Sequence, residues 1–318
     1  MFKALIGTVL VGAALVNPTV ASASRPADDG RLVAITDQQS EDGPAARIRV
    51  LDPKVADWSK PAAEKWSWSP TARNGFADLT AAWGLPSDAK LRRTRSGREV
   101  ALVTDSRGLA AVASYPSGRR VWGTNVGGPA NPHSIELLPN GNVAVAASTG
   151  GFVRVYTASQ GAASATYAEY GLPDAHGVTW DPDHQVLWVL GGTRLAALKV
   201  TGPPAAPKLT ETELVTLPTD GGHDLAPALD NHDLLWVTTG SKVYRVSKSR
   251  AAIVATEDRA GIKSVTTNRA GRQVWTTPKP DCLTGWCTDT VNLEHPAATR
   301  TLPEAQIYKA RVWSASYE

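Results

Sequence analysis

The chain has 318 residues, of which 33 are Lys or Arg and 30 are Asp or Glu, so its formal net charge is only +3 at pH 7. Basic and acidic residues are well mixed, and no polybasic tail indicates nucleic-acid binding. Beyond the N-terminus no apolar run approaches the length of about 18 residues that spans a bilayer. From these features we expect neither a nucleic-acid-binding nor a membrane-spanning protein.

The first 23 residues have the pattern of a secretory signal peptide. Lys3 gives a positive start, residues 4–16 form a short apolar run, and residues 21–23 are small, as at a cleavage site. We therefore expect a secreted, extracellular protein whose mature part, residues 24–318, is a single domain. Cys282 and Cys287 are the only two cysteines, and in an exported protein we expect them to form a disulfide across a short loop.

Short strand-like segments then recur with a period in the forties, which is typical of a β-propeller. The first repeat contains segments at 31–37, 47–52 and 65–68 but lacks an inner strand. The five following repeats cover residues 88–127, 130–173, 174–221, 222–261 and 262–303. An unassigned strand at 307–313 remains, and we predict that it pairs beside 31–37 and closes a six-bladed ring without an open edge.

One segment between the first two repeats, residues 71–89, fits no strand pattern. We interpret it as a short helix or a loop that covers one face. A seventh blade in this segment is the alternative.

Three histidines occur at equivalent places, each at the start of the first strand of a repeat. His133, His176 and His223 follow one another at steps of 43 and 47 residues. Since the first strands of a propeller line one central channel, we expect these side chains to lie within about two strand spacings, roughly 10 Å, of one another. The same register extends the ring to three lysines, with Arg92 as substitute for the first: Lys90, Lys263 and Lys309.

A structural role, in which these residues only join neighbouring blades, is one reading of this ring. Crowded cations repel each other, however, so an anion is the expected compensation. The first functional hypothesis is a polysaccharide lyase that cleaves uronate-containing glycans by β-elimination. Lys263, Lys309 and Arg311 would hold the carboxylate, with Lys90 or Arg92 assisting; one histidine would take the C5 proton, and Tyr308 or a second histidine would protonate the leaving oxygen.

Two other hypotheses remain open. His133, His176 and His223 are a proper ligand set for a divalent metal ion, in a metal-dependent lyase, although the neighbouring lysines disfavour a cation and we expect no cofactor. The other is a propeller without catalysis that binds a ligand or serves as a scaffold. In each case the expected partner is an anionic polysaccharide or a small anionic ligand, and we expect a monomer.

Tryptophan is unusually frequent, with 11 residues against 7 Tyr and 3 Phe. Most of the tryptophans stand at repeated strand positions, where we expect them to pack between blades. An exposed one, such as Trp83, is a candidate for binding sugars.

Seven strings of the chain together resemble a family of secreted actinobacterial and fungal propellers known mainly as a domain of unknown function. They occupy residues 83–92, 103–110, 131–134, 146–151, 175–178, 222–225 and 286–291. A weaker resemblance is to propeller polysaccharide lyases, including one that removes rhamnose from glucuronate in plant gums. The first resemblance implies a propeller and no particular chemistry, and the second implies lyase activity.

Overall fold

The computed structural model describes residues 1–2, 32–38, 45–282 and 284–317. Most of the expected signal peptide therefore lies outside the described residues, as does Arg31. Among the described residues, no helix combines the length and apolar character needed to cross a membrane.

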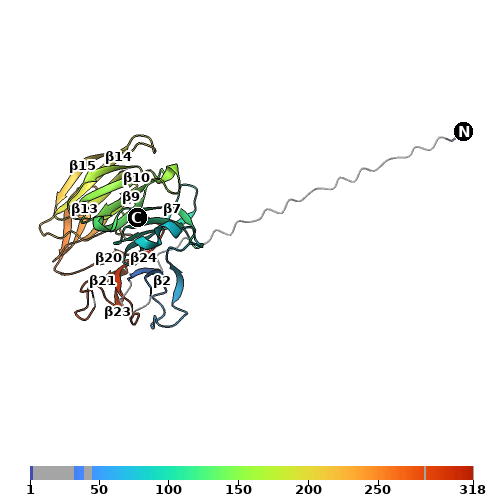
Figure 1. The fold of residues 1–318 in the computed structure, drawn as a ribbon. Coiled ribbons are helices and arrows are strands. Elements are labelled where there is room, and N and C mark those ends of the chain that lie inside the picture. Colours follow the sequence, from blue (N-terminus) through green and yellow to red (C-terminus); the bar gives the residue numbers. More distant parts are fainter. Residues whose placement is uncertain (3–31, 39–44, 283, 318) are drawn as a thin grey trace.

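The described chain forms a ring of six four-stranded antiparallel sheets, as the sequence predicted (Figure 1). The only helices in this part are three 3-10 helices, of which η1(Ala77–Ala82) is the longest. From the channel outward, the blades are β24(Ile307–Trp313), β1(Leu32–Asp37), β2(Arg47–Leu51) and β3(Glu64–Trp68); β4(Pro86–Arg93), β5(Glu99–Asp105), β6(Leu109–Ser114) and β7(Arg120–Asn125); β8(Pro132–Leu137), β9(Val143–Ala147), β10(Phe152–Tyr156) and β11(Tyr167–Gly171); β12(Ala175–Asp181), β13(Val186–Gly191), β14(Arg194–Thr201) and β15(Lys208–Thr216); β16(Asp224–Pro227), β17(Leu234–Thr238), β18(Val243–Ser247) and β19(Ala252–Glu257); β20(Ser264–Thr267), β21(Gln273–Thr276), β22(Thr290–Glu294) and β23(Ala298–Thr301).

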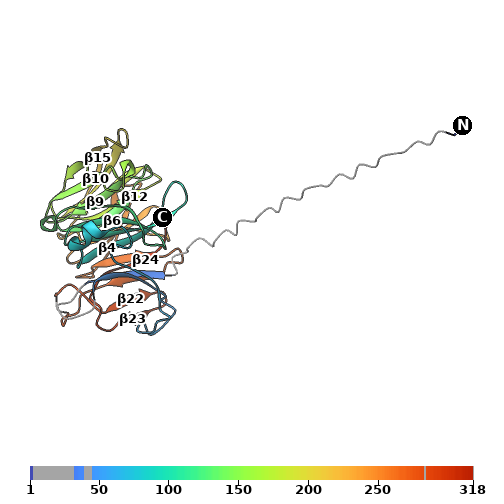
Figure 2. The ribbon, with the colours of Figure 1, turned by 45° about the vertical axis from the view of Figure 1, so that its right-hand side comes forward.

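The C-terminal strand closes the ring, which confirms the prediction for 307–313. Strand β24 lies beside β1 (Figure 2) and pairs with it antiparallel. Leu32 is opposite Trp313, and Ala34 is opposite Arg311. The first blade thus takes its inner strand from the other end of the chain. This pairing removes the edge that an open ring would leave exposed.

The segment at 71–89 contains no additional blade, so the seven-bladed alternative is wrong. It forms η1, whose Leu79 and Ala82 are buried in the core, and β4 begins within it, at Pro86. Residues 71–85 thus cover the gap between the first two blades. The inner strand of the second blade begins earlier than the sequence pattern indicated.

The blades pack through apolar side chains on both faces of their strands. In β9, Val143 and Val145 pack toward the second blade, and Ala144 and Ala146 pack toward the fourth. Trp122, Trp188, Trp236 and Trp313 are almost completely buried, as expected for tryptophans between blades. Trp83 is half-buried, donates from Nε1 to the Ala46 carbonyl at 3.1 Å, and packs edge-on against Trp68. It is therefore not the exposed sugar-binding tryptophan that we anticipated.

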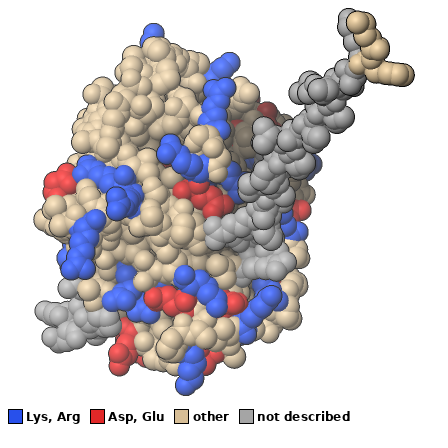
Figure 3. All heavy atoms as spheres, turned by 90° about the vertical axis from the view of Figure 1, so that its right-hand side faces the viewer, with Lys and Arg blue, Asp and Glu red and all other residues tan. Residues whose placement is uncertain are grey.

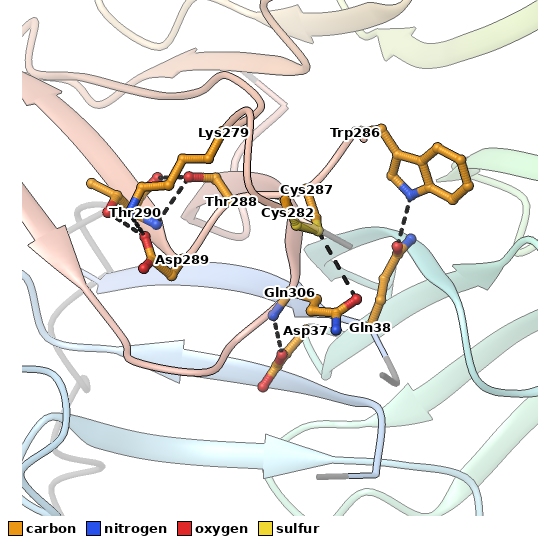
Figure 4. The surroundings of a disulfide bond; sticks show 10 residues. All are labelled: Asp37, Gln38, Lys279, Cys282, Trp286, Cys287, Thr288, Asp289, Thr290 and Gln306. Atoms are coloured by element: carbon orange, nitrogen blue, oxygen red, sulfur yellow. Dashed lines mark hydrogen bonds and ion pairs between the residues drawn. A yellow bond between two sulfur atoms is a disulfide. The ribbon is translucent and has the colours of Figure 1, made fainter. Parts of the chain in front are cut away.

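Charges on the outside are interspersed, which agrees with the even mixture in the sequence. The face in Figure 3 carries Lys and Arg next to Asp and Glu, without a large area of one sign. The disulfide between Cys282 and Cys287 is formed, with a Cα–Cα distance of 5.7 Å (Figure 4).

Candidate functional site at the channel mouth

A β-bulge marks the start of several inner strands, and it determines which residue faces the channel mouth. In β4, β8 and β12 the register shifts after the first residue, so that the second residue has no partner in the ladder. A bulged residue is re-aimed away from the regular alternation. Backbone hydrogen bonds identify the equivalent positions in the other blades: His223 donates to the Thr238 carbonyl and Lys263 to the Thr276 carbonyl.

One residue from each blade therefore occupies the mouth position. In ring order these are Tyr308, Ser87, His133, His176, His223 and Lys263. The expected ring differs at two places: Ser87 occupies the position assigned to Lys90, and Tyr308 occupies the position assigned to Lys309. Lys309 lies one residue further along its strand, and Lys90 three residues further.

The three histidines lie together, well within the expected 10 Å. The ring centroids of His133 and His176 are 4.4 Å apart, those of His176 and His223 are 4.8 Å apart, and those of His133 and His223 are 6.3 Å apart. Gly177 permits this close approach, because a Cβ atom there would lie 2.5 Å from the Cβ of Leu225 in the next blade.

Backbone carbonyls orient two of the imidazoles. Nδ1 of His133 lies 2.9 Å from the Asn131 carbonyl, and Nδ1 of His176 lies 2.9 Å from the Asp174 carbonyl. Asn131 and Asp174 both adopt left-handed φ values, 57° and 56°, which only a few per cent of residues other than glycine do. Because a carbonyl only accepts, Nδ1 carries the proton, and a neutral His133 keeps an unprotonated Nε2.

Tyr308 completes the cluster from the closing strand. Its hydroxyl lies 2.9 Å from Nε2 of His223, and its ring centroid lies 5.8 Å from that of His133. The phenol and two imidazoles therefore form one hydrogen-bonding and aromatic group.

A pocket of about 370 Å³ opens at this cluster. Its lining includes four residues that the sequence interpretation did not select as site residues. They are Trp286 and the polar residues Gln38, Ser106 and Asn131. His133, His223, Lys263 and Tyr308 line the same pocket. His176 is not among its lining residues, although its ring centroid lies 4.4 Å from that of His133. A volume of this size is in the range of ordinary small-ligand sites.

Burial and neighbouring charges keep two of the imidazoles, His133 and His223, neutral. The pKa values of His133 and His223 are lowered well below 6.5, first by desolvation and then by repulsion from His176, Lys309 and Lys263. At neutral pH both side chains are therefore uncharged, and each neutral ring has one nitrogen that accepts a proton.

Tyr308 is shifted in the opposite direction. Burial, followed by the negative charges of Asp224 and Asp88, raises its pKa well above 10. The pKa of Lys263 is lowered by burial and by Lys309. The pocket thus combines a proton acceptor, a protonated phenol and a lysine, which is a set suited to general acid–base chemistry.

Below the mouth lies a buried ion network that the sequence interpretation did not anticipate. The Arg311 guanidinium contacts Asp88 at 2.5 Å through Nε and Asp224 at 2.6 and 3.2 Å through its two terminal nitrogens. Nζ of Lys309 lies 3.1 Å from Asp224 Oδ1, but it makes no hydrogen bond of ordinary geometry with any residue that the structure describes. Both cations are almost inaccessible to solvent.

The network continues toward the far end of the channel. Lys90 donates to the Val178 carbonyl at 2.6 Å, and Arg92 makes a bidentate pair with Glu136 at 2.8 and 2.7 Å. Arg92 also stacks on the ring of Tyr317, 4.7 Å from its centroid. Lys90 and Arg92 therefore lie away from the mouth pocket, with their donors engaged inside the protein.

Protein carboxylates supply much of the compensation for which we had expected a bound anion. Asp88, Glu136 and Asp224 are fully buried and face the buried cations Lys90, Arg92, Lys309 and Arg311. With every group in its usual charged form, the network carries one excess positive charge. The carboxylate-binding role assigned to Arg311 does not fit this arrangement, because all its contacts with acids are internal.

The arrangement gives little support to a three-histidine metal centre. In the part of the chain that the structure describes, no group of three His, Cys, Asp or Glu residues has a geometry that could hold a metal ion. Nε2 of His223 is engaged by Tyr308, and Lys263 and Lys309 are close enough to lower the pKa values of the histidines. A divalent cation would meet the same repulsion.

The fold and the pocket define a six-bladed β-propeller with an imidazole–phenol cluster at one end of its channel. The chain belongs to a family of unknown function, DUF6528, whose family model matches residues 47–316. No curated protein matches the chain. The match to this family confirms the resemblance to a propeller family without a known activity.

Solved structures share the fold at low sequence identity. A putative 6-phosphogluconolactonase from Bacteroides uniformis is 13% identical with a TM-score of 0.55, and the match covers 88% of this chain and 82% of the other. A protein of unknown function from Bacteroides caccae is 11% identical with a TM-score of 0.51, covering 87% and 93%. These likenesses concern the architecture alone and do not bear on lyase activity.

Proposed function

We propose that this protein is a secreted carbon–oxygen lyase that cleaves a uronate-containing polysaccharide by β-elimination. The observation that carries the proposal is the pairing of a neutral imidazole, His133, with a protonated phenol, Tyr308, in one pocket that also contains Lys263. β-Elimination requires a base, an acid and a positive group at the substrate carboxylate.

The reaction assigns one role to each group. Lys263 binds the carboxylate and so acidifies the C5 proton of the uronate. Nε2 of His133 removes that proton, the C4–C5 double bond forms, and the C4–O4 bond breaks. Tyr308 gives its proton to the departing O4, and its hydroxyl is held by the hydrogen bond with His223. The phenolate then takes a proton from solvent, and the His133 imidazolium releases the C5 proton to solvent, which restores both groups.

The buried cations assist from below the pocket. Lys309 is adjacent to Tyr308 in the chain and holds a positive charge under the mouth, where low polarity strengthens its effect. We assign Lys309 and Arg311 to this electrostatic role and Lys263 to direct contact, because Lys263 lines the pocket and Arg311 is enclosed by Asp88 and Asp224.

The Cys282–Cys287 disulfide supports an oxidising, extracellular setting. The pattern of residues 1–23 predicts the export that would bring the protein there. Plant and microbial polysaccharides are degraded outside the cell, so the proposed location and substrate agree.

The test is a panel of uronate polysaccharides incubated with the purified protein and followed by absorbance near 235 nm, where the unsaturated product absorbs. We expect turnover of at least one member, and a loss of about 10²-fold or more in rate for His133→Ala, since one proton transfer is removed. His232→Ala changes an exposed histidine outside the pocket and should leave the rate unchanged. Full activity of His133→Ala on a confirmed substrate would refute the assignment.

A second candidate is a propeller that binds an anionic glycan without cleaving it. The observation in its favour is the Lys309 ammonium, which is buried beneath the mouth and has no hydrogen-bond partner among the described residues. Calorimetric binding of a uronate oligosaccharide without any 235 nm product would favour this candidate over the lyase.

A further inference from the structure

We infer that Trp286 is the sugar-stacking residue of the mouth pocket and that the Cys282–Cys287 disulfide holds it in place. The inference deepens the proposed function, on which it rests for the class of ligand. The sequence interpretation left this role open for exposed tryptophans, with Trp83 as its example, and gave the cysteine loop no part in the site.

Trp286 differs from all the other tryptophans. All 11 tryptophans lie within the described residues, and the other ten are buried or half-buried. Trp286 is exposed, with 43% of its surface accessible. It lines the same pocket as His133, His223, Lys263 and Tyr308. An exposed indole face costs free energy in water, and at the edge of a polar pocket it offers an apolar surface to a ligand.

The indole is held at its edge, so that its position is defined although it is exposed. Nε1 donates to Oε1 of Gln38 at 3.0 Å, and Nε2 of Gln38 donates to the Pro86 carbonyl at 3.2 Å. Gln38 is itself almost fully buried. Figure 4 shows the indole extending away from the disulfide toward this glutamine.

The loop that carries Trp286 is attached to the site at its other end. Cys287 is fully buried next to Trp286, and the following residue, Thr288, exchanges two backbone hydrogen bonds with Ile307, at 3.0 and 2.7 Å. Ile307 directly precedes Tyr308 in the chain. Trp286 is therefore connected to the proposed acid by two peptide steps to Thr288, one β-bridge to Ile307 and one further peptide step, and the disulfide anchors this path at Cys287.

The chemistry of the pocket selects the ligand class. Lys263 offers a positive charge to an acidic group, the imidazoles and the phenol offer hydrogen bonds to hydroxyls, and the indole offers a flat apolar face. A pyranose ring has hydroxyls at its rim and C–H groups on its faces, so a uronate sugar matches all three features. Aromatic residues with one apolar face and one polar edge are suited to such mixed surfaces.

The test compares Trp286→Ala with Trp286→Phe and with the double variant Cys282→Ser/Cys287→Ser. The probe is a glucuronate- or galacturonate-containing trisaccharide, with its carboxyl-reduced form as the neutral control. Binding is measured by calorimetry, and the fold of each variant is checked by its melting temperature. Tyr167→Ala is the matched control, because Tyr167 is also 43% exposed but lies on the outer strand β11.

We expect Trp286→Ala to weaken binding of both trisaccharides about tenfold or more, Trp286→Phe to weaken it less, and Tyr167→Ala to have no effect. The double serine variant should weaken binding while its blades remain folded. Unchanged affinity of Trp286→Ala, or failure of every uronate trisaccharide to bind the wild type, overturns the inference.

The same set of variants separates this inference from the lyase proposal. Binding that depends on Trp286 without any 235 nm product would support the stacking role and contradict the lyase. Product formation with an unchanged KM in Trp286→Ala would support the lyase and contradict the stacking role.

Discussion

Replacing Asp224 by Asn tests the buried ion network with almost no change in shape. Asp224 is 1% exposed and contacts two cations: two nitrogens of Arg311, at 2.6 and 3.2 Å, and Nζ of Lys309, at 3.1 Å. After the substitution only Asp88 faces Arg311, and Lys309 loses its ion pair. Removing one partner of a buried pair costs about 3–5 kcal/mol. We expect a loss of stability in this range.

The assay is thermal and urea denaturation of Asp224→Asn beside Asp78→Asn. Asp78 also pairs with an arginine, Arg120 at 2.7 Å, but its side chain is 61% exposed. Exposed pairs contribute about 0–1 kcal/mol. At about 2 °C per kcal/mol for a domain of this size, we expect Asp224→Asn to melt about 6–10 °C lower than the wild type and Asp78→Asn within about 2 °C of it.

The pH dependence gives a second measure of the same charge. Arg311 and Lys309 hold the pKa of Asp224 below its usual value of 3.8 against the opposing effect of burial. A lowered pKa in the folded state stabilises the protein above the unfolded pKa, near 3.9, and this contribution disappears as the pH falls through the folded pKa. The difference in stability between wild type and Asp224→Asn should therefore be constant from about pH 5 to 7 and shrink below about pH 4. Equal melting temperatures for Asp224→Asn and Asp78→Asn would refute the reasoning.

Three further predictions concern the proposed reaction. Tyr308→Phe removes the proton donor and its hydrogen bond to His223, and the 235 nm rate should fall about 10²-fold or more; an unchanged rate would remove Tyr308 from the mechanism. Lys263→Met should weaken binding of a uronate trisaccharide about tenfold or more, the usual range for a charged hydrogen bond, and should leave the carboxyl-reduced analogue unaffected; equal losses in calorimetry would contradict a carboxylate contact. Because the pKa of His133 is well below 6.5, a base at this position stays neutral down to that pH, so the acid limb of kcat/KM should lie below pH 6.5 and a midpoint above it would count against His133.

The number of blades, the closing strand and the meeting of the histidines could all be predicted from the sequence, for one physical reason. Each repeat contains one inner strand, and a ring brings equivalent positions of these strands to one channel. The register of His133, His176 and His223 was therefore sufficient to predict that their side chains meet, because the same residue type stands at the same place in three successive blades.

The remaining mouth positions could not be read in the same way. Ser87 is of a common residue type and differs from the histidines of the other blades, so no sequence pattern marks it. The bulge that places it at the mouth depends on how β4 pairs with β5. Lys90 was chosen because its spacing from His133 falls within the repeat length, although the equivalent residue is three positions earlier. The sequence did contain one useful pattern. Two residues before each of four ring members stands a residue type that tolerates a left-handed backbone, and these residues have positive φ values in the structure: Asn131, Asp174, Gly221 and Gly261.

The ion network was also within reach of the sequence, through the alternation of side chains along a strand. Asp88, Lys90 and Arg92 are two residues apart on β4 and so face the same side. Considering only the histidines and lysines of the ring, without these carboxylates, led to the expectation that an anion would bind. Trp286 was out of reach, because its place at the pocket depends on contacts of its loop with Gln38 and Ile307, which are distant in the sequence.

The buried ion network changes the pKa values of the mouth cluster, and the direction of each change follows from the sign of the neighbouring charge. Buried ion pairs are weak contributors to net stability compared with apolar packing, so stability alone gives little reason to keep seven charged groups inside a channel. The network also acts on the mouth. In addition to burial, Lys309 lowers the pKa values of His133 and His223, while Asp224 and Asp88 raise that of Tyr308. Neutralising Asp224 should therefore lower the pKa of Tyr308 toward that of free tyrosine as well as destabilise the fold. If a folded Asp224→Asn variant retained the wild-type pH profile, the network would be structural and separate from the chemistry at the mouth.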